Sequence, residues 1–249
     1  MKEITMDVFY DELSGLLDTL LEKEEKNIKA GAEIMAETVA NGGVVHVLGS
    51  GHSVGFAMEM RDRVGSLACI HKIETNDFVL KGKVSLEEFK DNTNPFERRA
   101  GVGDQLYDLY DVRPEDCFII ISNSGINGVV IDLAVAAKQH GHKVIVVTSW
   151  QHTSSEDSRH PSGFKLYEKG DVVIDNCGPC GDALIETGKI EKICSVSSIT
   201  GAFIAQALEC ETGRILKEKG VELPIYWDEA LEGAKEHNEA LRAQYALRV

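Results

Sequence analysis

Positively charged residues are scarce in this chain of 249 residues. It has 26 lysines and arginines against 41 aspartates and glutamates, a net charge of −15. Because nucleic acids and anionic membranes are bound by basic patches, this balance argues against both as partners. No apolar run approaches the roughly 20 residues that cross a bilayer, and the acidic N-terminus lacks a signal-peptide pattern. These absences predict a cytoplasmic protein that binds neither nucleic acid nor a membrane.

Cysteine is sparse as well, with six residues spread along the chain. That number is too small for a disulfide scaffold. Only Cys177-Gly178-Pro179-Cys180 forms a pattern, that of a dithiol redox motif, but no convincing helix follows it to lower a thiol pKa. No second Cys pair or close His pair completes a zinc site. We therefore expect no cofactor and no metal, and interpret the cysteines as small apolar residues.

Apolar runs typical of buried strands alternate with helical patterns. The expected strands are 44–48, 117–121, 143–147 and 172–175, with a weaker one within 67–73. The expected helices are about 5–40, 54–64, 129–140, 197–219 and 229–245. This alternation predicts an α/β fold with a parallel, doubly wound sheet.

We interpret the chain as a single domain, because no repeat, low-complexity tract or clear linker divides residues 1–249. It comprises an N-terminal helical segment (1–40), an α/β core (44–190) and C-terminal helices (195–249). Residues 76–116 are polar and irregular and are expected to be an insertion that reaches over the site.

Two strand-to-helix connections share the same chemistry. The first loop (residues 49–53) reads Gly49-Ser50-Gly51-His52-Ser53, and the second loop (residues 122–127) reads Ser122-Asn123-Ser124-Gly125-Ile126-Asn127. Glycine permits tight turns, and N–H groups at a helix start hold phosphate. Because neither residues 49–55 nor residues 122–128 include lysine or arginine, we expect amides, hydroxyls and helix N-termini to bind a phosphate at short range.

A dinucleotide site is the rival interpretation of the first loop. Gly49, Gly51 and Gly55 resemble a variant of the dinucleotide fingerprint, and Glu74 lies about 25 residues further on, where a ribose-binding acid is expected. A dinucleotide domain needs one such turn, however. A second loop rich in hydroxyls favours a single phosphate on a polar small molecule, and the dinucleotide is the weaker alternative.

The two loops resemble the phosphosugar loops of the sugar isomerase (SIS) domain family, and Thr148-Ser149 matches the end of that family's third strand. The resemblance covers roughly residues 40–190 and, through Ser158-Arg159-His160-Pro161-Ser162-Gly163, extends to full-length proteins with one SIS domain. These are related to phosphoheptose isomerase and N-acetylmuramic acid 6-phosphate etherase. The resemblance implies a three-layer α/β/α sandwich with a flavodoxin-like sheet, a homodimer or homotetramer, and a phosphorylated sugar as ligand.

The motifs of individual family members match only in part. The glucosamine-type isomerase has a catalytic Glu where this chain has Ile126. The phosphoheptose type has a metal-binding His and a Glu where this chain has Glu59 and Arg63. The etherase type uses a Glu some twenty residues before the second strand, and Glu97 lies 19 residues before Asp116. The resemblance therefore supports Glu97 as a catalytic base and does not support a zinc site at Glu59 and Arg63.

Isomerisation and β-elimination both begin with removal of a proton from a carbon next to a carbonyl, which requires a base and a neighbouring acid. Glu97 and Glu59 are the candidate bases, and His160 is a candidate acid. We expect the ligand to contact both loops and the third strand end, namely Gly49, Ser50, Gly51, His52, Ser53, Ser122, Asn123, Ser124, Gly125, Asn127, Thr148 and Ser149. The prediction is a sugar-phosphate isomerase or lyase, and the alternative is a non-catalytic sugar-phosphate sensor.

Overall fold

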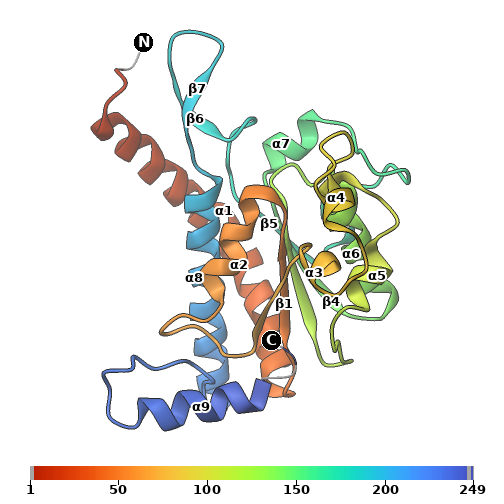
Figure 1. Cartoon of the computed structure of the whole chain (residues 1–249). Helices are drawn as coiled ribbons and strands as arrows, with labels where there is room; N and C mark the ends of the chain where they lie inside the picture. Colours follow the sequence, from red (N-terminus) through yellow and green to blue (C-terminus); the bar gives the residue numbers. More distant parts are fainter. Residues whose placement is uncertain (1–2, 246–247, 249) are drawn as a thin grey trace.

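The computed structural model describes residues 3–245 and residue 248, and its centre is a five-stranded parallel sheet (Figure 1). The strands are β1 (Val45–Gly49), β2 (Ile70–Ile73), β3 (Cys117–Ile121), β4 (Lys143–Thr148) and β5 (Val172–Asp175). Their order across the sheet is β2-β1-β3-β4-β5, and every neighbouring pair is parallel. This is the flavodoxin-like order of a doubly wound fold. The predicted fold class is confirmed.

The central strands are covered on both faces, which explains why their sequences are apolar almost throughout. Every residue of β1 and β3 is buried. Successive side chains of β3 enter different hydrophobic clusters, Ile119 on one side of the sheet and Phe118 and Ile120 on the other. The sheet is thus the middle layer of three.

One face of the sheet is covered by α1 (Met6–Ala40), α2 (Val54–Met60) and α8 (Ser197–Glu218), as Figure 1 shows. α1 and α8 pack closely, because a Cβ added at Gly31 would lie 3.0 Å from Leu208 Cδ2. α2 is shorter than the predicted 54–64 helix and ends at Met60. The residues after Met60 leave the helix, and Asp62 has a φ of +52°, which is incompatible with its continuation.

The opposite face is covered by α6 (Gly128–Gln139) and by the predicted insertion. The insertion folds into short helices, α3 (Asp77–Leu80), α4 (Leu86–Phe89) and α5 (Gly103–Tyr107), with a 3-10 turn at Phe96–Arg98. Its aromatic side chains, Phe78 and Phe96, are buried against the second cluster. It packs on α6 so closely that a Cβ at Gly103 would lie 2.4 Å from the carbonyl oxygen of Asp132.

The rest of the chain contains α7 (Trp150–Ser155), a 3-10 turn (Leu166–Lys169), β6 (Ala183–Glu186), β7 (Lys192–Ser195) and α9 (Ala234–Tyr245). β6 and β7 form an antiparallel hairpin that projects beyond the sheet in Figure 1. The sequence did not predict this hairpin. Most of its residues are exposed, so it has no apolar run to mark it.

A buried polar network lies between β1, β2 and β3. His46 Nδ1 is 2.8 Å from His71 Nδ1, and His46 Nε2 is 3.1 Å from Asp116 Oδ2. Burial lowers the pKa of His46, and it lowers the pKa of His71 to about 3. Both histidines are therefore neutral core residues near pH 7, consistent with their positions inside strands.

Two further features bear on function: the apolarity of the helices and the state of the Cys177 thiol. Among the residues described, none of the helices combines the length and apolarity needed to cross a membrane. Cys177 is buried, and burial raises the pKa of its thiol to about 12. This thiol is protonated near pH 7, which does not suit a redox nucleophile.

Candidate functional site

The first and second loops begin side by side at the carboxyl edge of the sheet. The first loop follows β1 and the second follows β3, and Gly49 pairs with Ile121 in the parallel ladder. β1 and β3 are the two strands at which the winding of the sheet reverses. Ligands of flavodoxin-like sheets bind at this switch point, in the crevice outside the strand ends.

The first loop is tightly turned but open to solvent. A Cβ at Gly49 would lie 2.1 Å from the carbonyl oxygen of Ser53, so only glycine fits there. Gly51 has a φ of +58°, in the region that favours glycine. Gly51 and His52 are exposed, and Ser50 and Ser53 are half-buried. Solvent therefore reaches the hydroxyl and imidazole side chains of this loop.

The second loop is folded on itself. The Ser122 hydroxyl accepts a hydrogen bond from the Gly125 backbone N–H at 3.1 Å. Gly125 has a φ of +62°, and a Cβ there would lie 3.2 Å from Thr153 Oγ1 and 3.3 Å from Thr148 Oγ1. Threonine side chains thus fill the space that this glycine leaves free.

Neighbouring strand ends support the second loop through Asn123. Its backbone oxygen accepts hydrogen bonds from the Thr148 hydroxyl at 3.1 Å and the Ser149 N–H at 3.0 Å. Its side-chain oxygen accepts one from Asn176 Nδ2 at 2.8 Å. Asn176 is buried and also accepts from the Gly178 N–H. Sequence reasoning missed Asn176; its position directly after a strand was the available signal.

Thr148 and Ser149, which were predicted to bind ligand, are fully buried beneath the loops. The Ser149 hydroxyl donates to the Gly178 carbonyl at 2.7 Å and accepts from the His152 N–H at the start of α7. Their hydroxyls are already used for backbone support. The structure brings them to the site as a floor beneath the second loop.

The start of α6 differs from an ordinary helix start. Asn127 is its N-cap residue, yet the Asn127 side chain makes no capping hydrogen bond. Its Oδ1 accepts instead from Arg159 Nη1 at 3.0 Å. Arg159 belongs to a segment 32 residues further along the chain, so no inspection of the loops themselves could reveal this cation. The sequence predicted binding through amides, hydroxyls and helix N-termini, and the structure adds a guanidinium beside the second loop.

The insertion brings Glu97 to the first loop. The Ser50 hydroxyl donates to Glu97 Oε2 at 3.0 Å. The stretch around Glu97 is held on α6, because a Cβ at Gly128 would lie 2.0 Å from the Arg99 carbonyl oxygen. Asp132 of α6 also accepts from the backbone N–H groups of Gly101 and Val102. The insertion therefore contacts the first loop and is fixed there.

The second candidate base, Glu59, lies on α2 and already has two partners. Its carboxylate forms an ion pair with Arg63 and accepts from Gln206 Nε2 at 3.0 Å. In the part of the chain that the structure describes, no group of three His, Cys, Asp or Glu side chains could hold a metal ion.

A buried carboxyl lies behind Glu59. Glu209 of α8 is 9% exposed and accepts from the Leu67 backbone N–H at 3.2 Å. Burial, with a smaller contribution from Glu59, raises the pKa of Glu209 to about 7. Its helical spacing from Ala205 and Thr212 places it on the buried face of α8.

His160 is held by both ring nitrogens. Nε2 is 2.9 Å from Asp132 Oδ1, and Nδ1 is 2.6 Å from Ser162 Oγ. Because an ionised carboxylate only accepts, the network assigns the proton to Nε2, and Nδ1 accepts from Ser162. Asp132 is the same residue that holds the insertion. The structure therefore connects His160 to the support of Glu97.

A small cavity joins the first loop to the start of α8. It has a volume of about 20 Å³, and its lining includes His52, Ser53, Asn176 and Ser197. Asp182 fixes this end of α8 by accepting from the Ser197 N–H and hydroxyl at 2.7 and 2.8 Å. The start of α8 thus forms part of the wall of this cavity.

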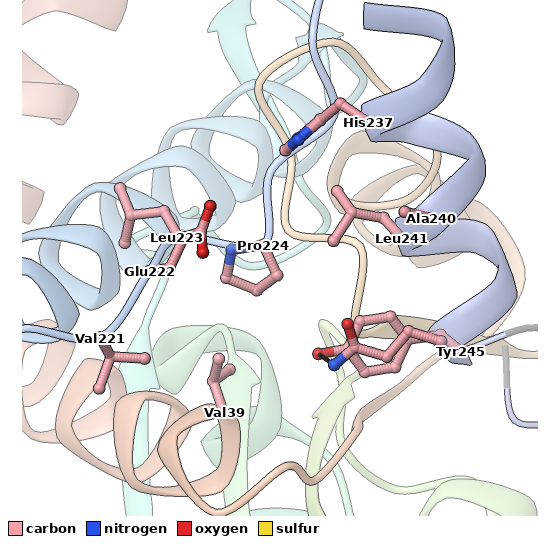
Figure 2. Close-up of a pocket in the computed structure, with 10 residues that line it drawn as sticks. Val39, Val221, Glu222, Leu223, Pro224, His237, Ala240, Leu241 and Tyr245 are labelled. Atoms are coloured by element: carbon pink, nitrogen blue, oxygen red, sulfur yellow. Dashed lines mark hydrogen bonds between the residues drawn. The ribbon is translucent and has the colours of Figure 1, made fainter.

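A larger cavity of about 390 Å³ lies elsewhere, between the end of α1, residues 221–224 and α9 (Figure 2). Val39, Leu223 and Leu241 are among its lining residues. Val39 precedes β1, which places the cavity near the amino ends of the strands. Its wall mixes apolar and polar side chains, among them Glu222, and lies at the end of the sheet away from the two loops.

Comparison with known families agrees with this geometry. A family model described as the SIS domain matches residues 8–149. The chain belongs to the SIS domain family. A UPF0309 protein of Halalkalibacterium halodurans is 37% identical over 231 residues, 92% of this chain and 93% of its own length. Another from Thermoanaerobacter pseudethanolicus is 35% identical and covers 97% of both chains.

Solved SIS structures share the fold. Phosphoheptose isomerase GmhA of Neisseria gonorrhoeae has a TM-score of 0.56 at 19% identity, covering 84% of this chain and 96% of its own. A phosphoheptose isomerase of Francisella tularensis has a TM-score of 0.56 at 14% identity, covering 86% and 100%. At these identities the likeness concerns the SIS fold alone. The predicted family is confirmed, and phosphoheptose isomerases share its fold.

Proposed function

We propose that this protein binds a phosphorylated sugar in the crevice between the first and second loops and acts on it as an isomerase or lyase. The observation that carries this proposal is the contact of Glu97 with Ser50, which holds a carboxylate at the switch point of the sheet. A base at this position lies beside the hydroxyls that would bind the ligand. The SIS membership and the phosphoheptose isomerase fold support the same ligand class.

The phosphate end of the ligand suits the second loop. Ser124 and Asn127 lie beside the first turn of α6, whose N–H groups and dipole favour an anion. The supports from Asn176, Thr148 and Ser149 fix the backbone before a ligand arrives. A site organised in advance loses less free energy on binding.

Glu97 is the proposed base, because Glu59 is occupied by Arg63 and Gln206. In the described part of the chain no side chain bonds the His52 ring, so His52 is free to donate to a sugar oxygen. His160, with both nitrogens engaged, fits a supporting role better than that of an acid. Proton transfer would thus involve the insertion and the first loop.

A non-catalytic sugar-phosphate sensor is the second candidate. Ile126, at the place of the glucosamine-type catalytic Glu, is fully buried and offers no proton transfer. A sensor would bind the ligand in the same crevice without moving a proton. The assembly into a homodimer or homotetramer and the cytoplasmic location stay predictions.

Exchange with solvent separates enzyme from sensor. The full chain is first screened by thermal shift with hexose, heptose and amino-sugar phosphates. NAD and NADP are included to test the alternative of a dinucleotide site. A stabilising sugar phosphate is then incubated in deuterated water, and an isomerase or lyase incorporates deuterium next to the carbonyl. Binding without incorporation indicates the sensor, and stabilisation by NAD or NADP alone overturns the proposal.

Two matched variants assign the base. Glu97→Gln should lower the exchange rate by about 100-fold or more, the usual contribution of general base catalysis. Glu59→Gln should leave the rate within a few fold of the unchanged protein, because its carboxylate is already paired with Arg63. The reverse result would transfer the role to Glu59.

A further inference from the structure

The segment 156–163 lies against the second loop, and the proposed function gives it no role so far. The Arg159 backbone N–H donates to the Ile126 carbonyl at 3.0 Å. Its guanidinium donates to Asn127 Oδ1 at 3.0 Å and to Glu156 Oε2 at 3.2 Å. Main chain and side chain together place a cation at the start of α6.

Unpaired hydrogen-bond donors are left over at this place. Asn127 is 9% exposed, its Oδ1 is taken by Arg159, and no residue within the described chain accepts from its Nδ2. Likewise, no described residue accepts a hydrogen bond from the backbone N–H groups of Gly128 and Val129 in the first turn of α6. A cluster of unpaired donors is complementary to an anion.

The charge of Arg159 also favours an anion at this place. A cation near the N-terminus of a helix faces the positive end of the helix dipole, which is unfavourable. Arg159 is nevertheless held there, with Glu156 as its only anionic partner among the residues described. A phosphate between the guanidinium and α6 would turn two repelling positive groups into two ligands of one anion.

The neighbouring residues fix Arg159 in this position. His160 bonds Asp132 of α6 at 2.9 Å, and the Ser158 hydroxyl accepts from the His160 N–H at 3.1 Å. The Leu166 N–H then donates to the Gly125 carbonyl at 2.8 Å. The segment is thus attached to the second loop and to α6 on both sides of Arg159.

We infer that Arg159 is a phosphate-binding residue of this site and selects phosphate esters over uncharged sugars. This inference rests on the proposed function and adds a residue to it. Arginine suits the role because its planar guanidinium can hold two phosphate oxygens at once. It also resolves how a chain with a net charge of −15 attracts an anion, since at short range one local cation outweighs a screened net charge. His160 is a positioning residue that acts through Asp132.

Titration calorimetry on the full chain tests the inference. The probes are inorganic phosphate, the sugar phosphate that stabilises the protein most in the thermal-shift screen, and the same sugar without phosphate. The variants are Arg159→Gln, Arg159→Lys and the control Arg214→Gln, which removes an exposed arginine of α8 paired with Glu211 and Glu218. Melting temperatures show that each variant is folded.

Arg159→Gln should weaken phosphate-ester binding by about 10- to 100-fold and flatten its dependence on salt. Arg159→Lys should lose less, because the charge remains but the two-pronged contact does not. Arg214→Gln should bind as the unchanged protein does. Binding by Arg159→Gln within two-fold of the unchanged protein overturns the inference and leaves the proposed function intact. If the unchanged chain binds neither sugar phosphate nor inorganic phosphate, both are overturned.

Discussion

The first and second loops have nearly the same composition but very different support. The first loop exposes Gly51 and His52, and its one side-chain hydrogen bond in the described structure joins Ser50 to Glu97. The second loop is largely buried and bonded to the ends of β4 and β5 and to the segment around Arg159. Similar sequences thus form one open and one anchored loop.

This difference indicates that the two loops bind different parts of the ligand. An anchored loop with few exposed groups keeps its donors in place, which suits the invariant phosphate of a ligand. A loop with few contacts opens at lower free energy and can adapt, which suits the variable sugar. Substitutions in the two loops should therefore have different effects, and the following four tests are ordered by expected size.

The largest effect is expected from Gly49→Ala in the first loop. Its new Cβ would lie 2.1 Å from the Ser53 carbonyl oxygen and 2.7 Å from the Val54 nitrogen, so backbone must move. We expect a loss of about 3 kcal/mol in the free energy of unfolding, as for overpacked sites. Urea denaturation measures it. Gly55→Ala is the control, because its Cβ would meet nothing within 4 Å. Equal midpoints for both variants would show that the open loop tolerates a rearranged backbone.

The next effect concerns pH and the helices behind the first loop. Burial raises the pKa of Glu209 to about 7 in the folded chain, from an ordinary value of 4.5. The folded chain therefore holds this proton more tightly than the unfolded chain does. The stability that protonated Glu209 contributes is fully present below about pH 4.5 and is lost as the pH rises through about 7. The expected loss is roughly 2–3 kcal/mol.

Glu209→Gln should remove that loss and be more stable than the unchanged protein at about pH 8. Urea midpoints at about pH 5, 6, 7 and 8 give the slope. Glu218→Gln, at the exposed end of α8, serves as the control and should show the same loss of stability with rising pH as the unchanged protein. A slope that survives in Glu209→Gln would assign the pH dependence to other groups.

Asn176→Ala tests the anchoring of the second loop. Asn176 is 4% exposed and bonds both Asn123 and Gly178, so its loss leaves buried groups without partners. We expect a cost of about 2 kcal/mol and weaker binding of phosphate esters. Asn238→Ala is the matched control, because Asn238 is 2% exposed and bonds Trp227 far along the chain. Its stability should fall similarly while its ligand affinity stays unchanged; equal affinities in both variants would contradict the anchoring role.

The smallest effects come from a pair of serines in the two loops. Ser122→Ala leaves the buried Gly125 N–H without its acceptor and should cost about 1 kcal/mol. Ser50→Ala removes a half-buried contact with Glu97 and should cost less than about 0.5 kcal/mol. Thermal unfolding of the two variants, side by side, measures the difference. If Ser50→Ala is the more damaging, the first loop is anchored more firmly than its contacts indicate.

Much of the architecture could be predicted because it depends on local patterns. The apolar, β-branched runs around Ile119 and Val146 indicate strands buried on both faces, whatever lies on them. The glycines of the first loop mark a turn that only glycine can make. The insertion was predicted to reach the site, and Glu97 does lie against Ser50.

Other features could not be predicted because they join distant segments. Arg159 meets Asn127 across 32 residues, and Asp132 meets both His160 and the insertion. Which carboxylate is free also depends on packing, since Glu59 and Glu97 look alike until Arg63 and Gln206 are seen to occupy Glu59.

The sequence by itself determined the α/β class, the two loops and the scarcity of positive charge within them, since periodicity and composition are local properties. Only the tertiary structure decided which loop is anchored and which is open, and where a cation enters the site. The reason is physical. Hydrogen bonds and charges act over a few ångströms, and folding decides which residues come that close.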